Sequence, residues 1–543
     1  MNLTGALRKK VSAWMPLEDL LPDELPAYVR SPAYFFGVAA LSSMVLLILS
    51  GIVLAIFGPH WWHADGVGHF VNSLHFWCSE LFFFTLTLHL WTEFFKGSWR
   101  HGRRLTWVVG GIGFALCIGT AFTGYLSQTN FSSQWIGVEA KDALNATGIG
   151  AFFNVLNFGQ IYGFHIMLLP LILVLLVGFH LLQVRIRGVV RPYAAKPQEE
   201  REVEKLWKHK KPKKGSTANE ESPPMPSDQR RYYRGVRMMP YDLIREGLFA
   251  LLGVFIVSVV LAAIFSSPDE PPLTLQSYSQ QSPVPFITTA MNELSGVGEI
   301  GQYGPPYNNS NGAVQSIGSI SLQTLAGVTV PVDVAKFYVL EPLSIAAISD
   351  PDLASALQTF SAASDKQQAD WEDAYTKALP DAKVSSGNLV LADGDYGPLP
   401  VMMNRLLGLG TSGALDGLLL RSGGFYQNDF TKPLLFLSED ALSTRAEQLN
   451  LLGSQWGMMN ETGNYPGQAW LWLYTFWYQV PPFNTSSNAD LLVSIIMAIL
   501  TAILIFLPFL PFINRVPYYL GIHRLIWREY YKDVKKAQIP EPV

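Results

Sequence analysis

Four histidines lie within long apolar stretches of this chain, where a polar side chain is costly and indicates a functional site by default. His75 and His89 are 14 residues apart in one stretch, and His165 and His180 are 15 apart in another. At ~100° per residue, an α-helix returns to within ~40° of its starting direction after 14 residues and ~60° after 15. Each pair is therefore predicted to share a helix face, with ~21 Å between its members along the axis.

The two stretches are predicted to cross a membrane in the same direction, so the histidines pair by depth. His75 is level with His165 on the outer side, and His89 with His180 on the inner side. Two imidazoles facing each other across a bundle can supply both axial ligands of a b-type haem. A single membrane histidine is equally explained by a hydrogen bond to a neighbouring helix, and zinc is disfavoured because each level has only two ligands. Four depth-matched histidines favour two b-type haems.

Glycines repeat with the same spacing. Gly37 and Gly51 are 14 residues apart in one apolar stretch, as are Gly110 and Gly124 in another. Glycine allows a flat macrocycle to approach the backbone closely, although small residues also mark ordinary helix packing in membranes. Beside the histidines, the glycines indicate one close approach per haem on each of two further helices.

The apolar stretches themselves predict the fold. The 543 residues are 49% hydrophobic and only 15% charged, and about 20 apolar residues suffice for a helix to cross ~30 Å of hydrocarbon. We predict an all-α membrane protein: a four-helix dihaem bundle, two further transmembrane helices and an extracytoplasmic inserted domain. The six predicted spans are residues 34–57, 72–95, 105–126, 161–184, 244–266 and 489–512.

Basic residues predict the orientation. The segment 185–239 carries 15 of the 39 lysines and arginines, whereas the loops 58–71 and 127–160 contain one lysine, Lys141. By the positive-inside rule, both termini are cytoplasmic and the protein is a multi-pass protein of the cell membrane. The predicted parts are a cytoplasmic amphipathic lead (1–33), the dihaem domain (34–184), a cytoplasmic basic linker (185–240), helix five (241–266), the extracytoplasmic insertion (267–487), helix six (488–514) and a cytoplasmic tail (515–543).

Residue usage limits the chemistry of the rest of the chain. The two cysteines, Cys78 and Cys117, lie inside predicted spans, and the absence of a Cys-x-x-Cys motif excludes covalent haem, iron–sulfur and thiolate-zinc sites within this chain. No histidine lies between His209 and His523. The insertion is thus expected to contact a partner or shield a site. We expect mixed, irregular structure in it, with helices between 333 and 380 and near 439–456.

The first 190 residues resemble the cytochrome b subunit of cytochrome bc complexes. The resemblance rests on the two glycine pairs, the four histidines, "RRLTWVVGG" before the third span and "TGY" at its end. The 15-residue histidine spacing resembles the plastid and Gram-positive type. The resemblance implies a subunit of a quinol:acceptor oxidoreductase. In that family, quinol is oxidised on the outer side, one electron goes to a Rieske iron–sulfur protein, and the other crosses both haems to quinone near the inner side.

The same resemblance implies partners and an inner quinone site. A Rieske iron–sulfur protein, a c-type cytochrome subunit or both are expected, in a homodimer within a larger complex, with no nucleic acid. Arg245 and Glu246, in "YDLIRE" at the start of span five, fall on the family's basic–acidic pair and would orient and protonate a quinone carbonyl. The alternative is an ordinary charged helix end at the interface.

Several positions depart from the family pattern. The loop after span three reads "GYLSQ" without Pro-Trp, and "PGQA" (466–469) stands where the family has Pro-Glu-Trp-Tyr, so the proton-accepting glutamate is missing and Glu461 is the nearest acidic candidate. Asn72 and Thr92 replace arginines that meet haem propionates. The possible inner-side substitutes are Lys96, Arg103, Arg104 and Arg185.

Two functions therefore stay open. In the first, the protein is a quinol-oxidising cytochrome b whose outer site is rebuilt by the insertion. In the second, the outer quinol site is non-functional, and the protein is a transmembrane conduit that exchanges electrons between an outer redox protein and quinone at the inner face. A purely structural or transport protein would leave the four depth-matched histidines unexplained.

Overall fold

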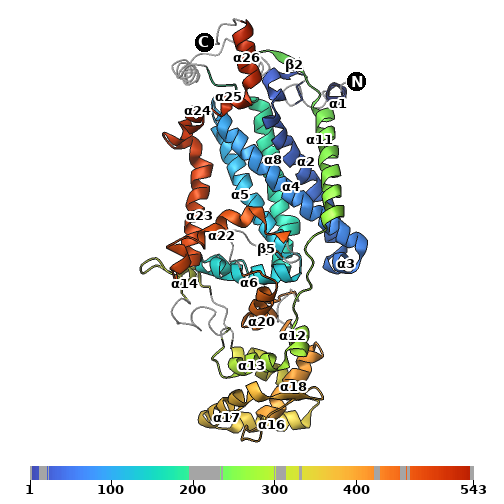
Figure 1. Cartoon of the computed structure of the whole chain (residues 1–543), viewed down its shortest axis with the longest axis vertical. Coiled ribbons are helices and arrows are strands. Elements are labelled where there is room, and N and C mark those ends of the chain that lie inside the picture. Colours follow the sequence, from blue (N-terminus) through green and yellow to red (C-terminus); the bar gives the residue numbers. More distant parts are fainter. Residues whose placement is uncertain are drawn as a thin grey trace, which may run out of the picture. The chain divides into compact units, whose positions relative to one another are not determined.

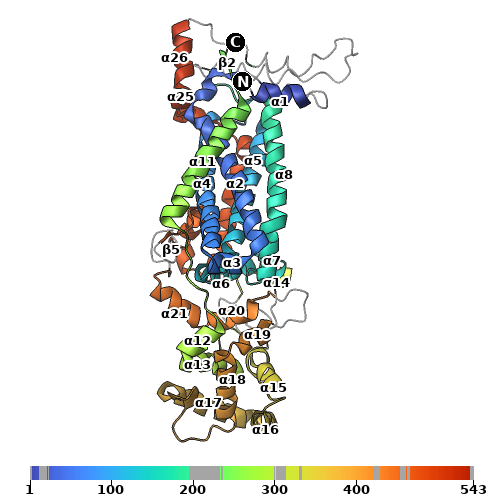
Figure 2. The ribbon, with the colours of Figure 1, turned by 90° about the vertical axis from the view of Figure 1, so that its right-hand side faces the viewer.

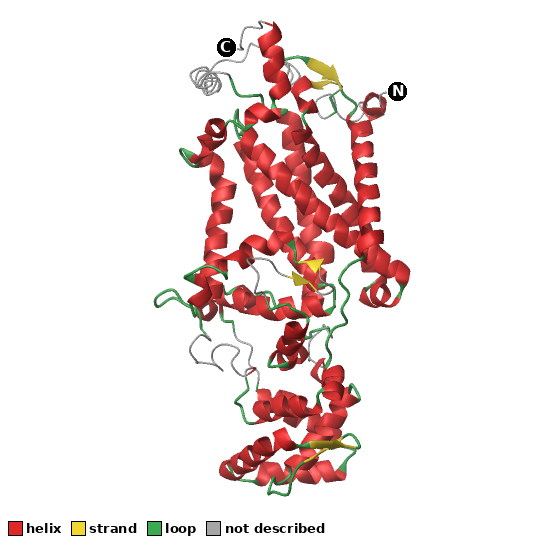
Figure 3. Cartoon of the chain, viewed as in Figure 1, coloured by secondary structure: helices red, strands yellow, loops and turns green. Residues whose placement is uncertain are grey.

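The computed structural model describes residues 3–11, 21–22, 24–194, 233, 236–298, 300, 314–328, 333–420, 428–452, 460–461 and 465–537. Within these residues the chain is mostly helical, with only short strands (Figure 3). It divides into two compact units. Unit 1 comprises residues 1–121, 166–267 and 498–543, and unit 2 comprises residues 122–165 and 268–497. Most of the predicted basic linker, residues 195–232, lies outside the described residues.

Unit 1 contains the long apolar helices. α2 packs along α4, and both contact α11; α5 and α8 run beside them (Figures 1 and 2). The helices that lie in this unit wholly or in part are α1 (Leu3–Val11), α2 (Phe35–Phe57), α3 (Pro59–Ala64), α4 (Gly66–Lys96), α5 (Arg104–Leu126), α8 (Leu169–Arg187), α11 (Leu243–Phe265), α23 (Ala489–Phe506), α24 (Val516–Leu520), α25 (His523–Ile526) and α26 (Arg528–Ala537).

Five described helices are long and apolar enough to cross a membrane, which makes the chain a multi-pass membrane protein. They are Pro32–Phe57, Arg104–Leu126, Phe158–Arg187, Leu243–Phe265 and Ala489–Phe509, and they correspond to five of the six predicted spans. The sixth predicted span, 72–95, lies within α4, which is 31 residues long. This helix is not among the five that are long and apolar enough to cross a membrane. Its serine, threonine, histidine and glutamate residues interrupt the apolar sequence and lower its mean hydropathy.

Local sequence sets the limits of α4. The Asp65 side chain accepts hydrogen bonds from the N–H groups of Val67 and Gly68, which satisfies two donors of the first turn. The helix ends at Lys96 because Gly97 adopts a left-handed conformation (φ 57°). A side chain on Gly97 would also collide with the Tyr193 hydroxyl. The residues after α4 therefore turn back onto its last turn.

A π turn, η4 (Phe164–Leu168), connects α7 (Phe158–Gly163) to α8. Its cause is Pro170, because a proline ring clashes with the carbonyl four residues earlier, here that of Ile166, and donates no hydrogen bond. A π turn holds about one more residue than an α turn and is frequent at functional sites. The π turn therefore accounts for the one residue by which the spacing between His165 and His180 exceeds the 14-residue spacing between His75 and His89.

Unit 2 has its own hydrophobic core. α18 shows how it forms: Leu399, Met402, Met403, Leu406 and Leu407 recur at helical spacing, and all are buried. The helices lying wholly in this unit are α6 (Phe131–Ala146), α7, α12 (Leu275–Gln281), α13 (Pro283–Leu294), α14 (Leu322–Ala326), α15 (Glu341–Ala346), α16 (Pro351–Ala362), α17 (Asp365–Ala378), α18 (Leu399–Thr411), α19 (Ala414–Leu420), α20 (Thr431–Ser438), α21 (Ala441–Gln448) and α22 (Trp472–Trp477).

The inserted region differs from the sequence-based expectation in two respects. Its described part is mainly helical, where mixed and irregular structure was expected, since α12 and α13 form within its Pro- and Gln-rich start. It also shares a core with residues 122–165: Phe131, Leu156 and Ile161 pack in one cluster with Phe286 and Leu435. The loop after the third span and the insertion therefore form a single folded body.

Three two-stranded antiparallel sheets are found among the described residues. They pair β1 (Glu24–Pro26) with β2 (Met238–Pro240), β3 (Lys383–Ser385) with β4 (Asn388–Val390), and β5 (Asn460–Glu461) with β6 (Tyr465–Pro466). The first of them ties the segment before α2 to the segment before α11.

Candidate functional site

The inner level of the candidate site is formed by four helices of unit 1. His89 on α4 and His180 on α8 lie close enough for their charges to interact. Gly37 on α2 faces the His89 ring: a Cβ there would lie 3.0 Å from both Cε1 and Nδ1. Gly110 on α5 faces the His180 ring, with 3.2 Å between its Cβ position and Cε1. Each imidazole thus lies against a backbone that carries no side chain.

At the outer level there are again two glycine–histidine contacts, one within each unit. Within unit 1, Gly51 on α2 faces His75 on α4, and a Cβ would lie 3.2 Å from Cε1. Within unit 2, Gly124 at the end of α5 faces His165 in the π turn, and a Cβ would lie 2.5 Å from Cε1. The four glycines singled out by their spacing are therefore each in contact with a different one of the four histidines.

At three histidines the Nδ1 atom faces a neutral oxygen. His180 Nδ1 lies 3.1 Å from the Thr106 carbonyl, which can only accept. His75 Nδ1 lies 2.9 Å from Ser50 Oγ, whose own proton is directed to the Leu46 carbonyl at 2.8 Å. His165 Nδ1 lies 3.4 Å from Thr123 Oγ1. The contacts of His180 and His75 favour a proton on Nδ1 and a basic Nε2, which is how metal-binding histidines are usually oriented.

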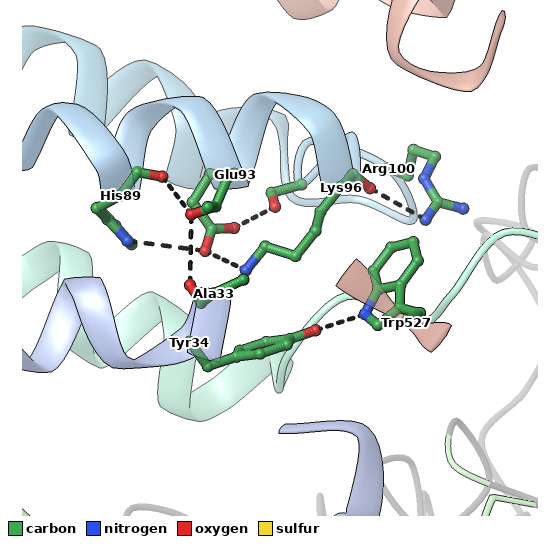
Figure 4. Close-up of polar contacts among 9 residues, drawn as sticks. Ala33, Tyr34, His89, Glu93, Lys96, Arg100 and Trp527 are labelled. Atoms are coloured by element: carbon green, nitrogen blue, oxygen red, sulfur yellow. Dashed lines mark hydrogen bonds and ion pairs between the residues drawn. The ribbon is translucent and has the colours of Figure 1, made fainter. Parts of the chain in front are cut away.

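The fourth histidine differs, because its Nδ1 faces a carboxylate. His89 Nδ1 lies 3.8 Å from Glu93 Oε1, and Figure 4 shows the two side chains projecting from the same helix. Thr92, at the position where the family has an arginine, donates its hydroxyl proton to the His89 carbonyl (2.9 Å), with the Ala33 carbonyl at 3.4 Å. Thr92 thus joins α4 to the turn before α2.

The residues present fit a b-type haem. Pairs of imidazoles commonly hold such a group, and each of the four imidazoles lies so close to a glycine that a Cβ there would stand 2.5–3.2 Å from its Cε1. Among the described residues, no group of three or more His, Cys, Asp or Glu side chains is placed to hold a metal ion.

Two of the proposed substitutes for the missing propionate-binding arginines are engaged elsewhere. Lys96 donates to Glu93 Oε1 at 2.5 Å. Arg103 donates to the carbonyls of Gly188 (3.1 Å) and Arg187 (2.5 Å), so that it closes the end of α8. Arg104 lies over the Phe509 ring at 5.3 Å, and Arg185 interacts electrostatically with Tyr241. Arg104 and Arg185 remain the candidates on the inner side.

The predicted inner quinone residues lie on the first turn of α11. Arg245 and Glu246 are half exposed, at 55% and 45%, and contact each other at 3.4 Å. Asp242 caps this helix, and its carboxylate also accepts hydrogen bonds from Leu3 and Thr4 of α1. The structure therefore places the pair at an accessible helix end that the N-terminal helix adjoins.

Gly467, which the resemblance aligns with the family's glutamate, accepts the Trp472 indole proton through its carbonyl at 3.2 Å. The backbone of Glu461 lies in β5, and its side chain is outside the described part. Three protic groups follow in the same unit. The Tyr474 and Tyr478 hydroxyls are 2.9 Å apart, and Tyr478 donates to Asp490 at 2.6 Å.

Sequence reasoning missed two features of this site. Glu93 was not considered, although an acidic residue one turn after a histidine is visible in the sequence and such pairs contact each other on a helix. The π turn at His165 was also missed, although Pro170 in "FHIMLLP" is the signal for a disturbed helix at that point.

Comparison with known proteins identifies the relatives of the N-terminal part. A family model described as "Cytochrome b(N-terminal)/b6/petB" matches residues 80–272, a range that includes His89, His165 and His180. Cytochrome b6 of Heliobacterium mobile is 27% identical over 199 residues, which are 32% of this chain and 92% of that protein.

Two further relatives belong to complexes of related type. The cytochrome bc complex cytochrome b subunit of Chlorobaculum thiosulfatiphilum is 28% identical over 36% of this chain and 50% of its own length. The menaquinol:cytochrome c reductase cytochrome b subunit of Geobacillus thermodenitrificans is 24% identical over 32% of this chain and 91% of its own length.

Proposed function

Because the N-terminal part of this chain is that of a divergent cytochrome b of bc complexes, we propose that it is a dihaem electron-transfer subunit of a bc-type respiratory complex. It moves electrons across the membrane between quinol or quinone and an extracytoplasmic redox partner. A Rieske iron–sulfur protein, a c-type cytochrome or both would be that partner, in a homodimeric assembly. As a subunit of an oxidoreductase, it works in the cell membrane with both termini in the cytoplasm.

The observation that carries this proposal is the matching of four glycines to four histidines. A bound b-type haem would supply reversible one-electron transfer at each level. The chain's own residues support both sites: Ser50 and the Thr106 carbonyl hold the Nδ1 atoms of His75 and His180, which would leave their Nε2 atoms to bind the iron. His75 and His165 serve the outer level, and His89 and His180 the inner one.

At the inner face, Arg245 and Glu246 would orient and protonate a quinone carbonyl. Their exposure favours access for a ligand, and their mutual contact keeps a proton donor beside a positive charge. Arg245→Gln and Glu246→Gln are expected to slow quinone reduction without changing the haem content.

A second candidate function rests on Gly467. Because no carboxylate stands at this position, quinol on the outer side lacks the family's proton acceptor, and the protein would act as a conduit between an outer redox protein and quinone at the inner face. The protic groups of Tyr474, Tyr478 and Asp490 are the alternative acceptors under the first function. Quinol oxidation measured with and without an outer-site inhibitor separates the two.

The test of the shared claim is a redox difference spectrum of the purified protein. We expect two b-type haems in the native chain and one in each of His75→Ala and His89→Ala. The matched control is His60→Ala, which removes an outer-loop histidine and should retain both. Two haems in each of the three variants would contradict the ligand assignment.

A further inference from the structure

The inner level carries a charge pair, Glu93 and Lys96, beside His89. Ser50 and Thr123 contact their histidines through hydroxyl groups, and Thr106 through its carbonyl. At His89 a carboxylate is present as well: Glu93 Oε1 lies 3.8 Å from His89 Nδ1. At that separation the contact is electrostatic, because a hydrogen bond requires ~3.2 Å or less.

The turn that ends α4 fixes the Glu93 carboxylate. Since Gly97 reverses the chain, the Ser98 N–H donates to the Glu93 carbonyl at 3.1 Å, and the Ser98 hydroxyl donates to Glu93 Oε2. Lys96 Nζ donates to Glu93 Oε1 at 2.5 Å. Both carboxylate oxygens therefore accept hydrogen bonds, which favours the ionised form.

Lys96 is held in place from its other side. Its side chain is only 1% exposed, and its ammonium lies 3.8 Å from the centroid of the Tyr34 ring. The Tyr34 hydroxyl in turn accepts the Trp527 indole proton at 2.9 Å. Figure 4 shows Lys96 between the Glu93 carboxylate and the Tyr34 ring, with Trp527 beyond it. The lysine therefore serves Glu93 and is not directed to a propionate.

The sign of the effect on an iron bound to His89 follows from charge. When ferric iron gains one electron, the site loses one unit of positive charge. A carboxylate near the ligand stabilises the ferric form and lowers the midpoint potential, whereas an ammonium raises it. Partners of the second nitrogen of a metal-bound histidine also raise its basicity, which acts in the same direction as the carboxylate. Because the carboxylate is nearer to His89, its effect is the larger one.

We propose that Glu93 and Lys96 form a charge pair that sets the potential of the inner haem, with Glu93 lowering it and Lys96 offsetting part of this effect. Glu93 is thus a positioning residue for His89. The inference rests on the proposed function, since it requires a haem on His89. It adds that a charge pair of this chain tunes the inner haem through the Nδ1 side of His89.

The experiment is an optical redox titration of purified Glu93→Gln, Lys96→Met and the double variant. The inner haem is identified as the one that His89→Ala removes. At a fixed ambient potential, we expect the reduced-to-oxidised ratio of the inner haem to rise about tenfold in Glu93→Gln, equivalent to ~59 mV for one electron. The ratio should fall in Lys96→Met and lie between the two in the double variant.

Two controls locate the effect. Asp533→Asn, which removes an exposed carboxylate of α26, should leave both haems unchanged, and Ser50→Ala should shift the outer haem only. A merely structural role for Glu93 would give shifts of the same sign in both single variants.

Three results would overturn the inference. The first is a shift of the inner-haem potential in the same direction in Glu93→Gln and Lys96→Met. The second is an unchanged inner-haem potential in Glu93→Gln with both haems bound. The third is a shift in Asp533→Asn equal to that in Glu93→Gln. The first two leave the proposed function intact, because haem is then present, whereas absence of haem from the native protein refutes both. If Glu93→Gln alone fails to fold, the double variant, in which neither partner is left without the other, decides: a reduced-to-oxidised ratio above that of the native protein supports the inference, because the carboxylate has the larger effect, and a ratio equal to or below it overturns the inference.

Discussion

A methyl group at Gly124 is expected to remove the outer haem. The substitution Gly124→Ala places a Cβ 2.5 Å from Cε1 of His165 and 3.0 Å from both ring nitrogens. Carbon atoms in contact prefer separations of ~3.5–4.0 Å, so the imidazole must move by about 1 Å or rotate. Either movement takes Nε2 away from the position in which it would bind iron.

The size of the effect follows from the cost of overpacking. Extra atoms in a tightly packed site typically cost ~1–3 kcal/mol, and each ~1.4 kcal/mol is a factor of ten in an equilibrium constant. Binding of the outer haem should therefore weaken about 5- to 150-fold. A smaller effect is expected for Gly51→Ala and Gly110→Ala, where the new Cβ would lie 3.2 Å from the nearest ring atom.

The assay is the ratio of haem to protein after purification, with a redox difference spectrum to tell one level from the other. Gly119→Ala is the matched control, because a Cβ at this position of the same helix would meet no atom within 4 Å. We expect Gly124→Ala to retain the inner haem and lose the outer one, and Gly119→Ala to retain both. Full haem content in Gly124→Ala, or an equal loss in Gly119→Ala, would refute the assignment of Gly124 to the site.

Three further predictions concern other parts of the chain. Burial, together with the neighbouring Glu439 carboxylate, raises the pKa of Glu293 to about 8, against ~4.3 in an unfolded chain. Between these values the folded state holds a proton that the unfolded state has lost, so stability falls with rising pH by on the order of 1.4 kcal/mol per pH unit. Glu293→Gln should therefore raise the unfolding temperature at pH 8 and not at pH 4, and an equal gain at both would exclude this cause. Asp242→Ala removes the acceptor for the backbone of Leu3 and Thr4 and should make the N-terminal helix more sensitive to limited proteolysis, whereas Glu246→Ala serves as the control. Ser50→Ala leaves the Nδ1–H of His75 without its serine acceptor and should raise the midpoint potential of the outer haem in a redox titration; an unchanged potential would argue against the assigned tautomer.

The positions of the apolar helices could be predicted from the sequence because membrane spans depend on local composition. The predicted limits 105–126 and 244–266 differ from those of α5 and α11 by one residue at most. The pairing of each glycine with a histidine could also be predicted from the sequence, since residues with the same spacing on neighbouring helices lie at matching depths. For α4 the composition was an ambiguous signal of a membrane span, because polar residues, among them the candidate haem ligands His75 and His89, interrupt its apolar sequence.

Other features depend on contacts that a sequence does not display. Lys96 was interpreted as a partner for a propionate, because a lysine near the inner level has the right charge. The structure directs it to Glu93 through a turn that depends on Gly97. Likewise, composition indicated an irregular inserted domain, but burial of apolar residues such as Phe286 and Met402 in a common core stabilises helices there.

The shared core of residues 122–165 and the insertion has a consequence for how this chain can be shortened. The Phe131 N–H donates to the Glu270 carbonyl at 2.9 Å, Gln134 and Leu273 exchange two hydrogen bonds, and Asn154 donates to Thr431 at 2.8 Å. Removal of residues 268–487 would take these hydrogen-bond partners away from the segment 122–165, which contains His165. A shortened chain is thus expected to lose His165, the proposed ligand of the outer haem, from its position, and to keep the pair His89 and His180.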